Sequence, residues 1–350
     1  MKILLFGQIY PDSFAKNISV TLEHMGHDIV HMKHCLSNPE TVPFLKLLTY
    51  ATRLSSKVEE HWFRAFVRQT EAQQGDLILN VGMHLPPRVV KMLKQKSRAP
   101  LVIWFPDHLV NFWRQYIMAS DYDAFFFKDR HIVEFFRNKL GKQAFFLPEA
   151  CNPLWHRRIE LKEEEKRFYG CDLTLAGNMY YYRALLLEHF LDHDFKVWGA
   201  NYPRWLDSPV KSIYTNHYVA ELEKAKAFNA AKIIVNAMHY GEILGVNARA
   251  FEAAGCGAFQ ILDWKPNMDE FFQPEREVVT FRTLAELKEK VRYYLEHDKE
   301  RQDIADRAYE RAHKEHTYEH RLKRLLELTF GSNSGAEQAE LPGSLSMPLT

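Results

Sequence analysis

Residues 1–32 read MKILLFGQIYPDSFAKNISVTLEHMGHDIVHM, and this stretch indicates the fold of the N-terminal part of the chain. The apolar run Lys2–Phe6 has the length of a buried strand and ends in a turn at Gly7. A helical pattern follows over Asn17–Met25, and a second strand is predicted over Asp28–Met32. A strand, a helix and a strand in this order indicate a Rossmann-like parallel sheet.

Short apolar runs alternate with helical patterns through most of the remaining chain. The charged stretch Pro153–Lys166 interrupts this rhythm and predicts a solvated linker or a surface helix. The fold class is therefore α/β, with two Rossmann-like domains whose parallel sheets face a central cleft. Further strands are predicted at Asp76–Val81, Leu101–Phe105, Tyr122–Phe127, Ala144–Leu147, Cys171–Ala176, Phe195–Trp198, Lys232–Asn236, Ala258–Leu262 and Val278–Phe281.

The predicted domains are residues 1–155 and residues 156–312. Residues 313–330 are expected to form a further helix that could pack on either domain, including back on the first one. Residues 331–350 are poor in large apolar side chains, so we expect a disordered tail there.

The composition excludes several classes of protein. With 350 residues, of which 46% are hydrophobic and 26% charged, the chain is typical of a soluble protein with two domains. The 46 Lys plus Arg balance 45 Asp plus Glu, so nucleic acid is not an expected partner. No apolar run reaches the roughly 18 residues of a transmembrane helix. A cytoplasmic protein is expected, because the cysteines form no CxxC pair and lie far apart, at Cys35, Cys151, Cys171 and Cys256.

The segment Gly241–Leu262 carries the most chemical information. Asn247 is a good N-cap for a helix that runs to about Gly255, and the free N–H groups of such a helix start favour a diphosphate. Arg249 and Glu252 are three residues apart and share one face of this helix. An arginine beside phosphate and a carboxylate on two ribose hydroxyls would suit a sugar nucleotide; the alternative is a surface ion pair on a closely packed helix.

At NARAFEAAGCGAFQI (247–261) the chain resembles the signature of the CgeB/YkvP-like glycosyltransferases, which are related to the group 1 (GT4-type) GT-B enzymes. The stretch DLTLAGNMYYYR (172–183) resembles that family's strand followed by G-N-x-Y-x-x-R. Two later elements, 271–279 and 316–321, resemble its closing motifs, so the resemblance covers about residues 75–330.

This resemblance implies a GT-B fold, with the acceptor bound by the first domain and the nucleotide-sugar donor by the second. It implies transfer of a sugar from a nucleoside-diphosphate donor to a hydroxyl acceptor, with no cofactor and no metal. Glu252 would bind the donor ribose. The residues expected to bind the donor are Gly177, Asn178, Arg183, Asn236, His239, Asn247, Arg249 and Glu252.

One position departs from the related enzymes, many of which carry an E-x7-E pair. Leu244 stands eight residues before Glu252, where the earlier carboxylate is expected. Glu242 is two positions too early and would substitute for it only in a differently shaped loop. Retention or inversion at the sugar carbon is therefore left open.

The catalytic base is sought where strands of the first domain end, because ligands of such folds gather at the carboxyl ends of strands. Asp107 is the first candidate for the base or an acceptor ligand and His84 the second, with structural capping as the alternative for both. Gly7, Gln8 and Tyr10 are expected to line the same cleft, and Lys128 and Glu149 end later strands. The triplet Asp121–Asp123 precedes a strand, so we interpret it as a turn and not as a metal site.

Two other functions remain open: a nucleotide-sugar 2-epimerase with the same fold, or a catalytically silent homologue that binds a carbohydrate or a protein. The aromatic content of 13% raises one more expectation. Rings beside the cleft could stack on sugar faces, and the candidates are Trp104, Phe112, Trp113, Tyr116 and Tyr180–Tyr182. The sequence carries no signal for an oligomeric state.

Overall fold

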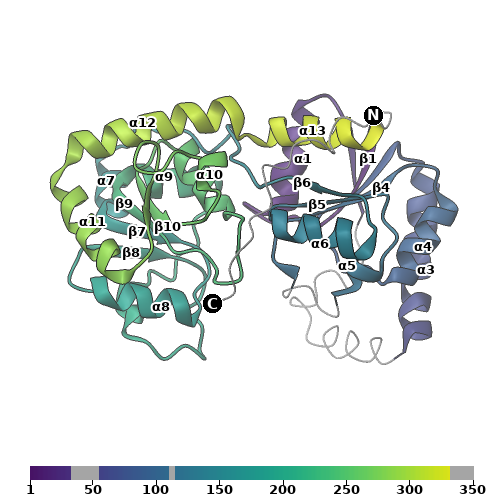
Figure 1. The fold of residues 1–350 in the computed structure, drawn as a ribbon, viewed down its shortest axis with the longest axis horizontal. Helices are drawn as coiled ribbons and strands as arrows, with labels where there is room; N and C mark the ends of the chain where they lie inside the picture. Colours follow the sequence, from purple (N-terminus) through teal and green to yellow (C-terminus); the bar gives the residue numbers. More distant parts are fainter. Residues whose placement is uncertain (33–54, 110–114, 332–350) are drawn as a thin grey trace.

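The computed structural model describes residues 1–32, 55–109 and 115–331. The described strands form two parallel sheets, one of six strands in the order β2-β1-β3-β4-β5-β6 and one of five in the order β11-β10-β9-β7-β8. Figure 1 shows each sheet in its own lobe, with helices packed around it. The predicted α/β class with two Rossmann-like domains is confirmed.

The first sheet is buried on both faces, as its continuously apolar strands require. Ile3 and Leu5 of β1 face the side covered by α1 and α13, whereas Leu4 and Phe6 face the side covered by α3, α4 and α6. The elements of this lobe are β1 (Lys2–Phe6), α1 (Phe14–His24), β2 (Asp28–Met32), α3 (Ser56–Gln73), β3 (Leu77–Asn80), α4 (Pro87–Lys96), β4 (Leu101–Phe105), α5 (Tyr116–Ala119), β5 (Ala124–Phe127), α6 (Arg130–Leu140) and β6 (Ala144–Phe146).

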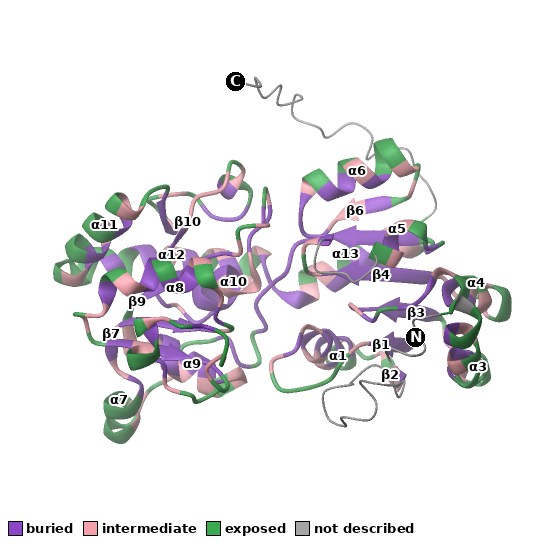
Figure 2. Cartoon of the chain, turned by 90° about the horizontal axis from the view of Figure 1, so that it is seen from below, coloured by how far each residue is buried: buried purple, intermediate pink, exposed green. Residues whose placement is uncertain are grey.

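The second sheet is also covered on both faces. Helices α8 and α11 pack on one face, α9 and α10 pack on the other, and α12 contacts both groups. Its elements are α7 (Glu163–Tyr169), β7 (Cys171–Ala176), α8 (Tyr181–Leu187), η5 (Glu188–Phe190), β8 (Phe195–Trp198), η6 (Pro209–Ile213), α9 (Glu221–Ala230), β9 (Ala231–Asn236), α10 (Ala248–Gly255), β10 (Gln260–Asp263), η7 (Met268–Glu270), β11 (Val279–Phe281), α11 (Leu284–Glu296) and α12 (Asp298–Glu315). In Figure 2 the strands are mostly buried, while α4, α6 and α7 show exposed faces.

The chain crosses between the lobes twice, and the two crossings pair with each other. Cys151 donates its N–H to the carbonyl of His316 at 2.9 Å, and Tyr318 donates its N–H to the carbonyl of Cys151 at 3.0 Å. The final helix, α13 (Tyr318–Phe330), then packs beside α1 on the first lobe (Figure 1). The last described helix therefore completes the core of the N-terminal lobe.

The carboxyl ends of both sheets face the seam between the lobes. Asp129, after β5, accepts hydrogen bonds from the N–H groups of Leu244 and Gly245, at 2.9 and 3.2 Å. Arg130 forms a two-pronged ion pair with Glu270, with Nε 2.8 Å and Nη2 2.6 Å from Oε2. Residues that follow strands of one sheet thus contact residues that follow strands of the other.

Part of the expected aromatic platform belongs to the core. Trp104 is fully buried, packs edge-on against Phe14, and donates its indole N–H to the carbonyl of Leu147. The prediction that it lies beside the cleft is wrong, because side chains alternate between the faces of a strand and this one points under α1 and α13. Phe112 and Trp113 lie outside the described residues.

Candidate functional site

The loop after β7 brings two arginines against one glycine. Gly177 has a φ of +135°, and a side chain there would collide with the guanidinium of Arg249 and come within 3.6 Å of Arg183 Nη1. Arg183 lies on α8 and is buried, whereas Arg249 lies in the first turn of α10 and is partly exposed. Glycine is therefore required here both for the backbone conformation and for the close approach of two cations.

Asn236 is the hub that orients this group. Its Nδ2 donates to Asn247 Oδ1 at 3.2 Å, and its Oδ1 accepts from Arg249 Nη1 at 3.2 Å. Asn247 caps α10, since its Oδ1 accepts the N–H of Ala250 at 3.1 Å, which confirms the predicted N-cap. Arg249 Nε also donates to the carbonyl of Ala176 at 2.6 Å. The end of β9, the start of α10 and the end of β7 are thereby locked together.

The two arginines form a region of positive charge. Burial and the charge of Arg249 lower the pKa of Arg183 to about 10, and burial lowers the pKa of Arg249, although Glu252 opposes this. In the part of the chain that the structure describes, no carboxylate forms an ion pair with either guanidinium. Arg183 is held instead by carbonyls, of which Ala237 O lies at 2.8 Å, and by the Tyr180 ring. The arrangement is suited to an anion that touches both arginines and the N-terminus of α10.

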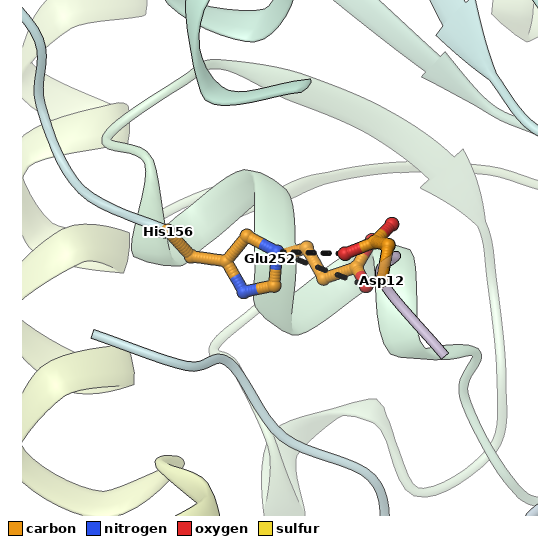
Figure 3. Close-up of side chains that lie close together, drawn as sticks. All are labelled: Asp12, His156 and Glu252. Atoms are coloured by element: carbon orange, nitrogen blue, oxygen red, sulfur yellow. Dashed lines mark ion pairs between the residues drawn. The ribbon is translucent and has the colours of Figure 1, made fainter. Parts of the chain in front are cut away.

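Glu252 lies one turn into α10 in a second, buried polar cluster (Figure 3). Its Oε2 is 2.7 Å from Lys224 Nζ on α9, and the same ammonium forms an ion pair with Asp12 of the first lobe. His156 Nε2 lies 3.8 Å from Asp12 Oδ1 and 3.9 Å from Glu252 Oε1. Burial would raise the pKa of Asp12, but Lys224 and His156 lower it to about 2.

Asp12, His156 and Glu252 lie close enough together to suggest a metal site, yet their chemistry does not fit one. His156 Nδ1 accepts the N–H of Asn152 at 2.9 Å, so the neutral ring carries its proton on Nε2, the nitrogen that faces the carboxylates. A protonated nitrogen cannot bind a metal ion. The Lys224 ammonium moreover already bridges the two carboxylates, so this cluster is an ionic one.

A third cluster spans the seam at Lys128. This buried ammonium lies 3.1 Å from Glu149 Oε2, at the end of the first sheet, and 3.2 Å from Glu242 Oε1, in the loop after β9. Burial raises the pKa of Glu149 to about 7, with Lys128 opposing and Glu242 and Asp107 adding to the shift. Glu242 Oε2 is buried without a hydrogen-bond partner among the described residues. Glu242 thus lies at the seam with one oxygen fixed and one oxygen unused.

The other residues that the sequence predicted on the donor side lie near the arginine pair. Asn178 is exposed and its carbonyl accepts from Arg183. His239 packs edge-on against Tyr180, stacks on the exposed Tyr240, and accepts the N–H of Gly241 at Nδ1. Both residues therefore belong to the same neighbourhood as Gly177.

On the first lobe, Asp107 and His84 are exposed and follow the neighbouring strands β4 and β3. Gln8 and Tyr10 are exposed after β1, and Gly7 allows Val81 and Ala15 to approach the backbone. These residues share the carboxyl edge that carries Lys128. Asp107 is also close enough to Lys128 and Tyr10 to influence the pKa of each.

The Asp121–Asp123 triplet lies before β5, at the opposite edge of the sheet. Lys94 forms ion pairs with Asp121 at 3.3 Å and with Asp123 at 2.9 Å, and Asp123 accepts the N–H of Leu101. The two carboxylates therefore have structural partners, and these contacts account for their position before β5.

Sequence reasoning missed Asp12, His156 and Lys224. Asp12 follows the loop of Gly7, Gln8 and Tyr10, so its position after β1 was a usable signal. Nothing in the pattern around His156 or Lys224 indicates that these residues meet Glu252. Gly245 allows the two lobes to approach closely, because a side chain there would lie 2.9 Å from the carbonyl oxygen of Lys128.

Comparison with known proteins agrees with the motifs. Residues 183–327 match a family described as "Glycosyl transferase-like". The spore protein CgeB of Bacillus subtilis (strain 168) is 22% identical over 259 residues, which cover 68% of this chain and 78% of CgeB. The resemblance to CgeB-like glycosyltransferases is thereby confirmed.

Solved structures share the fold of both lobes. The sucrose-phosphate synthase of Thermosynechococcus elongatus is 12% identical, with a TM-score of 0.66 over 93% of this chain and 98% of that one. Anabaena HepE in complex with UDP-glucose is 11% identical, with a TM-score of 0.64 over 94% of this chain and 99% of that one. This likeness shows the fold and confirms the expected GT-B architecture. None of the described helices is long and apolar enough to cross a membrane.

Proposed function

We propose that this chain, a CgeB-like glycosyltransferase of the GT-B fold, moves a sugar from a nucleoside-diphosphate donor to a hydroxyl acceptor without a metal ion. The observation that carries the proposal is the convergence of Arg183 and Arg249 on Gly177, at the N-terminus of α10. Two guanidinium groups without a carboxylate partner in the described chain, next to a helix start, provide the charge that a diphosphate needs.

The donor would lie along α10. Its diphosphate would bind Arg183, Arg249 and the N–H groups at the start of the helix, and its ribose hydroxyls would bind Glu252 one turn further on. Glu242, with its unpartnered Oε2, would face the transferred sugar. The similar HepE structure contains UDP-glucose, so UDP sugars are the first donors to test.

In the reaction, the bond between the anomeric carbon and the diphosphate oxygen breaks as the acceptor oxygen bonds to that carbon. Negative charge grows on the leaving diphosphate, and the arginine pair and the helix N-terminus would stabilise it in place of a metal ion. The proton of the acceptor hydroxyl would pass to Asp107, or to His84 at the end of the neighbouring strand.

A donor screen tests this function. Thermal-shift measurements with UDP, GDP and dTDP sugars should show stabilisation by one nucleotide family, because a ligand that binds the folded state raises its unfolding temperature. CMP sugars, which carry one phosphate and no diphosphate, should stabilise the protein less. Stabilisation should persist in EDTA, and Glu252→Ala should weaken it. If none of these nucleotides stabilises the protein, the proposed enzymatic function is wrong. Conversion of a donor to its epimer without an acceptor would point instead to a 2-epimerase.

A further inference from the structure

Lys224 is shared by carboxylates from the two lobes. Its ammonium lies 2.7 Å from Oε2 of Glu252, in the second lobe, and also pairs with Oδ2 of Asp12, in the first. Lys224 is 5% exposed and Glu252 is 8% exposed. A buried lysine without a partner would be strongly disfavoured, so these two ion pairs are what keeps the charge at this position.

Asp12 is held at this position by its own loop. Its φ of +67° lies in the left-handed region, which aspartate tolerates better than most residues. On the loop, the carbonyl of Pro11 accepts a hydrogen bond from the Tyr218 hydroxyl at 3.1 Å. On α1, Lys16 pairs with Glu221 of α9 at 2.5 Å. These contacts hold the loop of Asp12 against the second lobe, so that the Asp12 carboxylate lies next to Glu252.

We infer that Lys224 is a positioning residue for Glu252, needed because Asp12 of the opposite lobe brings a second negative charge to the carboxylate that binds the donor ribose. This inference rests on the proposed function. With Oε2 fixed by the ammonium, Glu252 keeps Oε1 for a ribose hydroxyl. Lys224 does not itself touch the donor in this arrangement.

The charges around Glu252 explain why the ammonium is needed. One carboxylate oxygen of Asp12, one of Glu252 and one ring nitrogen of His156 all lie within 4.8 Å of one another. Without Lys224, two carboxylates would share this site with a histidine that is neutral or singly charged. Two like charges so close in a poorly hydrated site force one carboxylate to take up a proton or to turn away. Either change would remove the ionised, correctly oriented acceptor that the ribose requires.

A set of four variants tests this role, with isothermal titration of UDP and GDP as the measurement. Lys224→Met should lower affinity for the bound nucleotide at least about tenfold, which is about 1.4 kcal/mol. Lys224→Arg keeps the cation and should stay within about threefold of wild type. Lys224→Met combined with Asp12→Asn should recover at least about threefold over Lys224→Met alone, because a single carboxylate remains. Lys226→Met, on the same helix but paired with Glu165 away from the cluster, should bind like wild type.

Unfolding temperatures measured without nucleotide distinguish a failure of the proposed function from a failure of the positioning role of Lys224. The double variant should unfold at a higher temperature than Lys224→Met alone, whether or not a nucleotide binds. If wild type binds no nucleotide, the proposed function and the positioning role both fail, even if this temperature difference is found. If wild type binds and Lys224→Met binds equally well, or if Asp12→Asn restores no affinity, the positioning role alone is wrong. Should Lys224→Met not fold, the Lys224→Arg and double variants decide the question.

Discussion

Arg183 and Arg249 converge on Gly177 from two different helices, and neither guanidinium has an ion pair in the described chain. Folded proteins rarely keep two cations together without a counter-ion, because each disfavours the charge of the other. Burial and the charge of Arg249 lower the pKa of Arg183, so keeping both guanidinium groups charged costs free energy. The diphosphate of the proposed donor would offset this cost by supplying negative charge to both guanidinium groups.

Arg249→Met should weaken nucleotide-diphosphate binding about 10- to 100-fold. A hydrogen bond to a charged group contributes about 1.5–3 kcal/mol, and the variant removes such bonds together with the charge. Titration of the nucleotide found in the donor screen measures the loss. Arg158→Met, which removes an exposed arginine paired with Asp306, is the control and should leave the affinity unchanged. Equal affinities for the two variants would exclude Arg249 from the donor site.

Gly177→Ala should reduce both stability and donor affinity. The new methyl group would collide with the guanidinium of Arg249, and the φ of +135° is strained for any residue with a side chain. Gly26→Ala is a matched control: Gly26 also has a positive φ, of +84°, but has open space around its Cα. Both variants should unfold at a lower temperature, while nucleotide titration should show a loss for Gly177→Ala alone. A loss of affinity in Gly26→Ala as well would mean that general destabilisation, and not the collision with Arg249, lowers the affinity.

Asp107→Asn should lower kcat while the donor affinity stays within about twofold of wild type. The amide keeps the shape of the side chain but cannot accept the acceptor's proton, and general-base catalysis contributes about 10²- to 10⁴-fold to a rate. Turnover at saturating donor and acceptor measures the effect, with His84→Gln assayed in parallel. A full rate in Asp107→Asn together with a low rate in His84→Gln would transfer the role of base to His84.

Glu149 should make stability depend on pH. Burial raises its pKa from about 4.5 to about 7 in the folded chain, so between these values the folded state holds a proton that the unfolded state has released. The free energy of unfolding should therefore fall as the pH rises from about 4.5 to 7. Glu149→Gln should flatten this part of the profile, measured by urea unfolding at several pH values. The exposed Glu71→Gln should leave the profile as it is, and an unchanged profile in Glu149→Gln would contradict the assignment.

Local pattern predicted much of the fold. The strands Lys2–Phe6, Leu101–Phe105 and Cys171–Ala176 begin and end where the sequence predicted, because a strand buried on both faces is a continuous apolar run. The N-cap at Asn247 followed from a short polar side chain placed before a helical pattern. Trp104 was misplaced, because an aromatic ring next to a strand end looks the same in sequence whether it faces the core or the cleft.

Two α/β lobes could be predicted from the sequence, as could the helix from Asn247 that carries Arg249 and Glu252. Each of these features depends on residues that are close together in the chain. The charged residues that pair across the seam could be identified only from the folded structure. Lys128 and Glu242 are 114 residues apart, and Asp12 reaches Lys224 from the other lobe. Such pairs depend on how the two sheets are placed against each other, and the lobes are joined by contacts such as the bridge between Cys151 and Thr317. Periodicity within a segment carries no information about it.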